Sequence, residues 1–236
     1  MHRFFILNHQ NNPTKEIIPQ KDLLNQLKKV LRIRKEEQII CIYENYELTG
    51  ILVEDKIIIK DVKTFSKELE KPSINLIQGI STNKKMAMIV QKAVELNANN
   101  IIFWQAHRST TSINDFISKK DRFEKIVLEA CEQTRRNIPP VLNYLTKLEN
   151  QEFGSNDLVI TLYENETKIH FSQVLNDLTA YDNIYLIIGP EGGIEPFELD
   201  LLIKKGSKIV TSGKNILRTE TAAYYALAVL DYLKNS

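Results

Sequence analysis

Apolar residues follow two different patterns along the chain, and the change falls near residue 72. Before it, apolar positions at helical spacing predict one short helix over residues 22–30. Strand-like runs then follow at residues 38–43, 48–53 and 56–62. These elements predict a small β-barrel or sandwich, and the charged segment 67–72, closed by a proline, is the expected linker.

From residue 73 onward, strand-like and helix-like segments alternate. Strands are predicted at residues 74–78, 100–104, 141–145, 157–163, 183–188 and 208–211. Helices are predicted at residues 84–96, 121–136, 195–205 and 219–233, with Thr219 or Thr221 as the N-cap of the last one. Alternation of this kind predicts an α/β fold with a mostly parallel sheet. We therefore expect two domains, residues 1–71 and 72–236.

The composition is ordinary for a soluble globular protein and argues against membrane insertion or export. Of the 236 residues, 43% are hydrophobic and 26% are charged. No apolar run approaches the roughly 20 residues that span a bilayer. The N-terminal segment becomes polar too quickly for a signal peptide. We therefore expect a cytoplasmic protein with no membrane partner.

The cysteines and histidines predict neither a disulfide nor a metal site. Cys41 and Cys131 stand far apart in apolar or helical contexts, as buried thiols in a reducing compartment do. The four histidines, at positions 2, 9, 107 and 170, lack the spacing of metal ligands.

Net charge is +1 and by itself indicates no partner. Residues 15–35 hold seven Lys or Arg against two acids, a local net charge of +5. Such a segment attracts polyanions, although a solvated helix face is the simpler interpretation of charge alone.

Glycines are concentrated in two loops near the C-terminus, which hold the candidate chemistry. Of eight glycines in the chain, four lie in loops that follow the predicted strands 183–188 and 208–211. Glycine is used where the backbone needs a positive φ or where a ligand lies against bare main chain. The loops therefore predict either a ligand pocket or two demanding turns, and the pocket is the sharper hypothesis.

Two common nucleotide sites do not fit these loops. No segment matches the G-x-x-x-x-G-K-[ST] pattern of a P-loop. A Rossmann site needs a glycine-rich turn after the first strand and an acid after the second. Here the first turn has only Gly79, and the second strand ends in Trp104-Gln105. A ligand is instead expected between the two C-terminal loops, beside the free N–H groups at the start of the last helix.

The loops belong to a longer series of ordered motifs. They read I-G-P-E-G-G over residues 188–193 and G-K-N-I-L-R-T-E-T-A over residues 213–222. Earlier segments read M-H-R-F-F at 1–5, V-L-R at 30–32, K-A-V-E-L at 92–96, R-S at 108–109 and E-A-C-E-Q-T-R-R at 129–136, with Pro139 beyond. Together these motifs resemble the RsmE family of ribosomal RNA methyltransferases, of the SPOUT superfamily. The resemblance covers nearly the whole chain, whereas G-P-E-G-G alone would be a weaker signal.

The resemblance implies a fold, a cofactor and a substrate. It implies an N-terminal PUA-like β-barrel for RNA and a C-terminal α/β domain with a deep trefoil knot for S-adenosylmethionine. It further implies a homodimer that methylates N3 of a uridine in the 16S ribosomal RNA of the small ribosomal subunit.

The resemblance also assigns roles to individual residues. Arg218 is expected to hold an RNA phosphate or the developing uridine anion, Glu220 to accept a proton, and Glu191 to accept a hydrogen bond from cofactor or base. The structural alternatives are an Arg218–Glu220 ion pair and, for Glu191, a charge before a helix. The expected cofactor-binding residues are Leu162, Ile188, Gly189, Pro190, Gly192, Gly193, Ser212, Gly213, Ile216, Leu217 and Thr219. The expected RNA-binding residues are Arg3, Arg32, Arg34, Arg108 and Arg136.

The chain departs from the family pattern at a few positions. Ser212 stands where a leucine is usual, which removes an apolar wall beside the adenine but leaves backbone contacts in place. Gln26 stands where a histidine is common and Glu36 where a glycine is common, which affects the turns and RNA contacts of the barrel.

Two other functions are open at this point. One is an RNA-binding or ribosome-assembly factor of the same fold that has lost catalysis, and the intact loops argue against it. The other is a SPOUT methyltransferase that acts on a ribose hydroxyl or on tRNA, and the N-terminal motifs argue against it.

Overall fold

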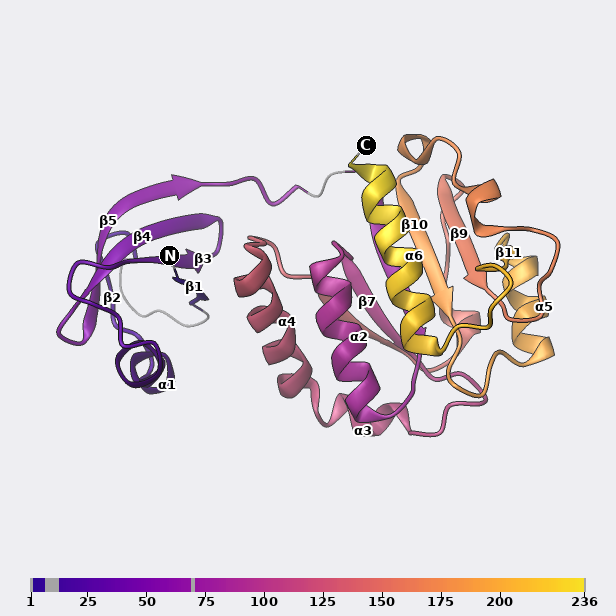
Figure 1. The fold of residues 1–236 in the computed structure, drawn as a ribbon, viewed down its shortest axis with the longest axis horizontal. Coiled ribbons are helices and arrows are strands. Elements are labelled where there is room, and N and C mark those ends of the chain that lie inside the picture. Colours follow the sequence, from indigo (N-terminus) through magenta and orange to yellow (C-terminus); the bar gives the residue numbers. More distant parts are fainter. Residues whose placement is uncertain (1, 7–12, 69–70, 236) are drawn as a thin grey trace. The chain divides into compact units, whose positions relative to one another are not determined.

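The computed structural model describes residues 2–6, 13–68 and 71–235 (Figure 1). Met1 of the N-terminal motif, His9 and the linker residues Leu69 and Glu70 lie outside the described residues. The chain forms two compact units. One comprises Met1–Glu68 with Cys131–Ile138, and the other comprises Leu69–Ala130 with Pro139–Ser236. The sequence did not predict that residues 131–138 group with the N-terminal unit.

The N-terminal unit contains a five-stranded sheet with the order β1-β3-β4-β5-β2. Its strands are β1 (His2–Phe5), β2 (Glu16–Ile17), β3 (Gln38–Tyr43), β4 (Tyr46–Val53) and β5 (Lys56–Thr64). β1 pairs with β3 in parallel, and the other pairs are antiparallel. The predicted helix is present as α1 (Lys21–Asn25), which continues into a π-helix, η1 (Gln26–Val30). The sequence missed β1 and β2, the strands that precede this helix.

Alternating apolar residues of these strands form the core of the N-terminal unit. Ile39 and Cys41 alternate with less buried neighbours along β3, which directs both side chains to one face. They pack with Phe4, Ile17, Leu27, Leu48 and Ile57. Each fully buried side chain of this size contributes about 1.5–3 kcal/mol.

The C-terminal unit is built on a six-stranded sheet whose strands all run parallel. Its strands are β6 (Ser73–Gly79), β7 (Asn100–Trp104), β8 (Val141–Leu145), β9 (Asp157–Leu162), β10 (Asn183–Ile188) and β11 (Lys208–Val210). Its helices are α2 (Asn83–Glu95), α3 (Ile113–Ile117), α4 (Lys120–Thr134, whose last turn groups with the N-terminal unit), α5 (Pro196–Lys204) and α6 (Thr219–Lys234). Short 3-10 turns lie at η2 (Leu148–Asn150), η3 (Phe171–Val174) and η4 (Leu178–Ala180). The predicted parallel α/β arrangement is confirmed, and α3 was missed.

The strand order, β11-β9-β10-β6-β7-β8, departs from the order along the chain. β10 lies between β9 and β6, so a late strand is inserted beside the first strand of this unit. In that register Ile188, at the end of β10, faces Gln78 of β6 on one side and Leu162 of β9 on the other. Because the strands are parallel, the loops after β6, β9, β10 and β11 meet at one edge of the sheet. Such edges are where open α/β sheets bind ligands.

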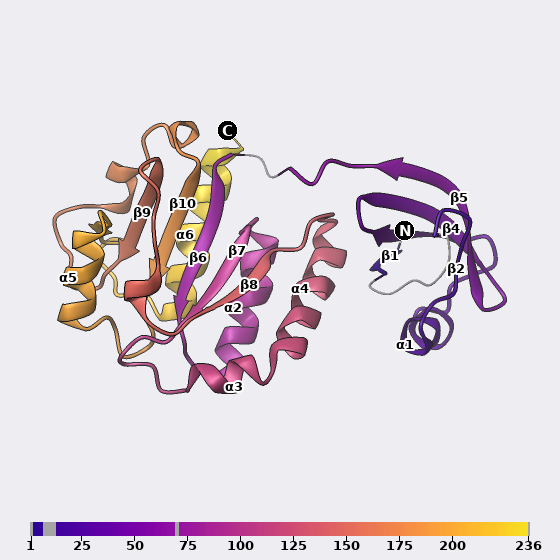
Figure 2. The same cartoon turned by 180° about the vertical axis from the view of Figure 1, so that it is seen from behind.

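Helices cover both faces of this sheet. Helices α2 and α6 lie in front of the strands in Figure 1 and behind them in Figure 2, whereas α5 lies on the other side. On the α5 face, Ile77, Val159 and Ile187 of three adjacent strands pack with Leu202 of α5. On the α6 face, Gln78 reaches helix α6 directly.

Both cysteines are buried free thiols, as the sequence predicted. Burial raises the pKa of Cys41 to about 12 and that of Cys131 to about 11.

Among the described residues, no helix is long and apolar enough to cross a membrane, and no cluster of three His, Cys, Asp or Glu side chains could hold a metal ion.

Candidate functional site

A cavity of about 1110 Å³ opens at the carboxyl ends of β9, β10 and β11. Its wall comes from the three loops that follow these strands, from the first turns of α6 and from Lys85 on α2. The lining residues are Lys85, Leu162, Tyr163, Glu164, Glu166, Thr167, His170, Ile188, Gly189, Pro190, Glu191, Gly192, Gly193, Thr211, Ser212, Gly213, Lys214, Asn215, Ile216, Leu217, Arg218, Thr219 and Ala222.

Every residue expected to bind the cofactor lines this cavity, from Leu162 to Thr219. Two of the three expected catalytic residues, Glu191 and Arg218, line it as well. The third, Glu220, is not among the lining residues, but its carboxylate is 3.5 Å from the ammonium of Lys85, which is. The fold thus brings together positions that lie as much as 58 residues apart in the sequence, between Leu162 and Glu220.

The loop glycines are needed by the fold itself. Gly193 and Gly213 have φ angles of +78° and +133°, which residues with side chains rarely adopt. A Cβ on Gly193 would also lie 2.5 Å from Oε1 of Glu164, and one on Gly192 would lie 2.9 Å from Cβ of Arg108. Both interpretations of these loops therefore apply. The loops line a pocket, and their turns also require glycine.

Gly79 has the tightest surroundings of any glycine in the chain. A Cβ there would lie 2.4 Å from the backbone nitrogen of Pro190 and 2.8 Å from the carbonyl carbon of Gly189. The single glycine of the turn after β6 therefore lets the loop after β10 pass directly against it. The sequence reading considered Gly79 only as an incomplete Rossmann turn.

Thr219 holds the two loops together and does not cap α6, so the predicted N-cap is wrong. The N-cap position is Arg218, whose side chain makes no capping hydrogen bond. The hydroxyl of Thr219 instead donates to the carbonyl oxygen of Gly189 at 2.6 Å and accepts from Nε2 of Gln78 at 2.8 Å. Thr219 is 7% exposed and Gln78 is fully buried, so these bonds are shielded from water.

Lys85 bridges two of the predicted catalytic carboxylates. Its ammonium lies 3.1 Å from Oε1 of Glu191 and 3.5 Å from Oε2 of Glu220. The Ser81 hydroxyl also donates to Glu191. Hydrogen bonds from Ser81 and Lys85 lower the pKa of Glu191, and the bond to Glu191 raises the pKa of Lys85. Glu191 is therefore an anchored anion and a weak proton acceptor near neutral pH.

Arg218 does not form the ion pair with Glu220 that was the structural alternative. Among the described residues, no carboxylate lies within 4.0 Å of its guanidinium, and the nearby Glu220 pairs with Lys85. Arg218 is exposed at the rim of the cavity, and its charge contributes to the lowered pKa of Glu191. Its guanidinium is available to an anion that enters the cavity.

Arg108 supports the loop after β10. Its Nη1 donates to the carbonyl oxygen of Gly192 at 3.0 Å, and its Nε donates to Glu195 at 2.7 Å. The bond to Glu195 raises the pKa of Arg108 and lowers that of Glu195. Two donors of the Arg108 guanidinium are therefore engaged within the protein. The sequence predicted an RNA contact for Arg108 and did not predict these two bonds.

The other expected RNA-binding residues belong to the N-terminal unit and differ in exposure. Arg32 and Arg34 are exposed, and Arg136 is half-buried. The side chain of Arg3 is only 7% exposed and pairs with Glu47 at 3.1 Å, so this guanidinium is engaged within the N-terminal unit. Glu36 has a φ of +75°, which explains why glycine suits this position.

Sequence reasoning missed several residues of the cavity, above all Lys85. One physical signal was available, because Lys84 and Lys85 lie in the first turn of a predicted helix, where the helix dipole disfavours cations. Such a lysine needs nearby anions. Glu164, Glu166 and His170 carried no signal, since they lie in the loop after β9, which contains no recognisable motif.

Comparisons with known proteins agree with this geometry. The profile of an RNA methyltransferase domain matches residues 68–231. Ribosomal RNA small subunit methyltransferase E of Buchnera aphidicola subsp. Schizaphis graminum is 35% identical over 226 residues, with 89% of this chain and 87% of that protein covered. The Bacillus subtilis protein of that name is 30% identical over 250 residues, with 98% and 96% covered.

A similar solved structure carries a ligand. It is a crystal structure of a ribosomal RNA small subunit methyltransferase E from Neisseria gonorrhoeae bound to S-adenosyl methionine. Its TM-score is 0.81 at 27% sequence identity, with 99% of this chain and 98% of that chain covered.

Proposed function

The chain belongs to the family of ribosomal RNA small subunit methyltransferase E, and on this basis we propose that it transfers the methyl group of S-adenosylmethionine to N3 of a uridine in 16S ribosomal RNA. The observation that carries the proposal is the cavity at the carboxyl ends of β9, β10 and β11, which collects all the cofactor-binding positions expected from the family motifs. The similarity to relatives named as small subunit ribosomal RNA methyltransferases extends over nearly the whole chain.

The residues of the cavity suit S-adenosylmethionine. Its volume of about 1110 Å³ slightly exceeds the range of about 300–1,000 Å³ that is common for small-molecule sites. Ile216 lines it with 78% of its surface exposed, so an apolar side chain is available for a ligand to cover. Leu162 and Leu217 also line the cavity and add apolar wall. Glu164, on the same wall, suits a cationic ligand.

The chemistry required of the protein follows from the two reactants. S-adenosylmethionine supplies an activated methyl group, so the protein must orient the reactants and remove the acceptor's proton. Uracil N3 carries that proton at neutral pH. Glu220 is the candidate acceptor, because Glu191 is anchored by Ser81 and Lys85. Arg218, at the rim, stabilises the negative charge of the uracil or holds a neighbouring phosphate.

The remaining family features belong to the same proposal. The N-terminal unit acts as a PUA-like barrel that presents Arg32 and Arg34 to RNA phosphates. The C-terminal unit forms a trefoil knot, which is supported by the insertion of β10 between β9 and β6. The enzyme works as a homodimer in the cytoplasm on the small ribosomal subunit. The functional domains are residues 1–71 and 72–236, with 131–138 grouped with the first.

The experiment that tests the proposal follows a labelled methyl group from S-adenosylmethionine into RNA. The purified protein is incubated with small subunits or 16S RNA from a strain that lacks the modification, and the nucleosides are identified by mass spectrometry. We expect labelled N3-methyluridine. Binding of S-adenosylmethionine without transfer would instead favour the non-catalytic assembly factor, and label in ribose or tRNA would favour another SPOUT activity.

A further inference from the structure

Lys85 is a cation in a position that its own helix disfavours. It lies in the first turn of α2, a turn without an acidic residue, where the positive end of the helix dipole is located. The side chain is 29% exposed. The anions that neutralise the charge of Lys85 therefore come from other elements. They are Glu191 and Glu220, two residues of the proposed active site.

The bridge joins three elements that are distant in the sequence. Lys85 comes from α2, Glu191 from the loop after β10, and Glu220 from the first turn of α6. The two carboxylate oxygens are 3.1 and 3.5 Å from one ammonium, so they lie at most about 7 Å apart. Without the lysine, two carboxylates at this separation would repel each other.

The two carboxylates are not equivalent. Glu191 also receives the hydroxyl of Ser81 and lies near Arg218. Glu220 is 16% exposed, and its Oε2 is buried without a hydrogen bond, so Lys85 is the nearest described cation that supports its charge. Loss of Lys85 would therefore affect Glu220 more than Glu191.

We propose that Lys85 is a positioning residue for methyl transfer, which fixes the carboxylate of Glu220 in place by bridging it to Glu191. This inference rests on the proposed function. In the step it serves, the uracil N3–H bond breaks and an O–H bond forms on Glu220. The electron pair stays on N3 and forms the bond to the methyl carbon as the sulfur–carbon bond breaks. Lys85 keeps its proton throughout, paired with Glu191.

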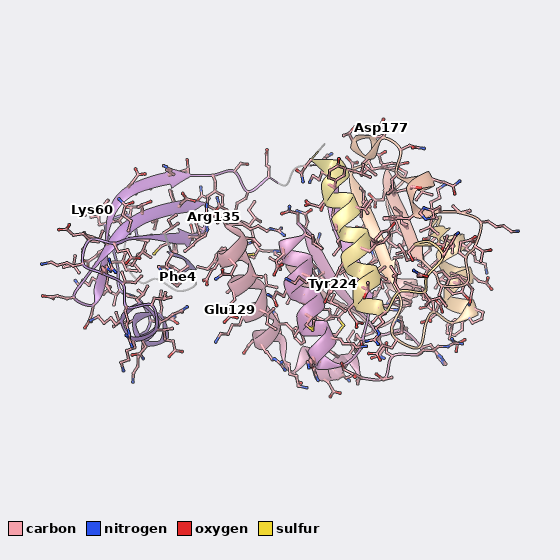
Figure 3. All side chains as sticks on the ribbon, in the orientation of Figure 1. Phe4, Lys60, Glu129, Arg135, Asp177 and Tyr224 are labelled. Carbon is pink, nitrogen blue, oxygen red and sulfur yellow. The ribbon has the colours of Figure 1, made fainter. Side chains whose placement is uncertain are left out.

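The split between transfer rate and cofactor affinity separates this role from a merely structural ion pair. A positioning role predicts that removal of the Lys85 charge lowers the transfer rate, that cofactor affinity is kept, and that a conservative Lys85→Arg change restores the rate. Tyr224 lies one turn beyond Glu220 on α6 and is labelled in Figure 3. The charged and titratable groups around the bridge are Glu191, Arg218, Glu220, Tyr224 and, acting on Tyr224, Glu95.

The test compares Lys85→Met with Lys84→Met, a matched control at the neighbouring exposed lysine. Single-turnover methyl transfer to 16S RNA is measured at pH 7, and S-adenosylmethionine affinity by calorimetry. For Lys85→Met we expect a rate about 100-fold lower. Cofactor affinity should change less than about threefold, and Lys85→Arg should restore most of the rate. Lys84→Met should match the wild type.

A wild-type transfer rate in Lys85→Met, or a rate loss explained entirely by weaker cofactor binding, would overturn the inference. If Lys85→Met is unstable, Lys85→Gln removes the charge with less change in polarity. A second readout needs no RNA: in NMR spectra of protein with ¹³C-labelled glutamates, assigned with Glu220→Gln, the carboxyl signal of Glu220 should shift in Lys85→Met and not in Lys84→Met. An unchanged signal in Lys85→Met would contradict the inference, whereas an inactive wild-type enzyme would contradict only the proposed function.

Discussion

The hydroxyl of Thr219 donates to the carbonyl oxygen of Gly189 at 2.6 Å, which ties the first turn of α6 to the loop after β10. Nε2 of Gln78 donates to the same hydroxyl, so three segments share one buried junction. The two loops that form the cavity are therefore held in register before any ligand enters. Preorganisation of this kind lowers the cost of binding.

Thr219→Val should destabilise the protein and weaken cofactor binding together. The substitution keeps the shape but removes the hydroxyl that bonds both the Gln78 amide and the Gly189 carbonyl. The two groups keep only their mutual contact at 3.4 Å and the bond from Gln78 to Gly79, so we expect a cost of about 1–3 kcal/mol. Denaturant unfolding measures the free energy, and calorimetry measures S-adenosylmethionine affinity. Thr219→Ser keeps the hydroxyl and should lose much less unfolding free energy and much less cofactor affinity. Equal behaviour of the two variants would show that the junction is unimportant.

Arg108→Met should weaken S-adenosylmethionine binding, because the Arg108 guanidinium supports the Gly192 carbonyl and Glu195. We expect about a tenfold loss of cofactor affinity, the equivalent of one hydrogen bond to a charged group. Arg34→Met is the control, since this exposed residue of the N-terminal unit should affect RNA binding alone. If Arg108→Met instead weakened RNA binding and left cofactor affinity intact, the original expectation of an RNA contact would be correct.

Arg218→Ala should reduce turnover far more than cofactor affinity. Arg218 is exposed at the rim, and no described carboxylate lies within 4.0 Å of it, so its charge is available to the RNA or to the uracil anion. A loss of about 100-fold in turnover is expected for removal of one such electrostatic contact, against less than about threefold in cofactor affinity. Comparable losses in both quantities would place Arg218 chiefly in the cofactor pocket.

Glu191→Gln should alter the dependence of stability on pH. Hydrogen bonds from Ser81 and Lys85 lower the pKa of Glu191 in the folded protein below its ordinary value of 4.5. A lowered carboxyl pKa stabilises the folded state above pH 4.5, and this stabilisation is lost as the pH falls through the folded-state pKa. The wild type should therefore be the more stable protein at pH 7, with a difference that shrinks on acidification below 4.5.

Denaturant unfolding at a series of pH values measures this difference. Asp200→Asn, at an exposed position on α5, is the control and should show a much smaller dependence. A Glu191→Gln difference that stayed constant from pH 7 to 3 would indicate that the hydrogen bonds, and not the charge, carry the effect.

The spacing of apolar residues was sufficient to predict most helices and strands of the C-terminal unit. The bounds predicted for β7, β8 and β10 are those found, because each is a short apolar run flanked by polar residues. The missed elements are short: β1 and β2 have four and two residues, and α3 has five. Segments of this length carry too few positions to establish a period. The insertion of β10 between β9 and β6 is a long-range pairing that no local pattern encodes.

The sequence predicted those parts of the candidate site that carry motifs. It did not predict contacts between residues of different elements. The glycine loops identified the cavity, but the N-cap expected at Thr219 was wrong, because a buried carbonyl at Gly189 competes for its hydroxyl. The contact of Arg108 with Gly192 was not predicted, because it joins residues 84 positions apart. Lys85 was missed for the same reason, since its two carboxylate partners lie over 100 positions further along the chain.

The central claim is that this chain places a methyl group on N3 of a uridine in 16S ribosomal RNA. Its most direct test is mass spectrometry of nucleosides from 16S RNA of cells in which this gene is deleted, with the wild type and the complemented deletion analysed in parallel. We predict that N3-methyluridine disappears from the 16S RNA of the deletion strain and returns with the intact gene, but not with an Arg218→Ala copy. Unchanged N3-methyluridine in the deletion strain, with no second enzyme of this type present, would contradict the account.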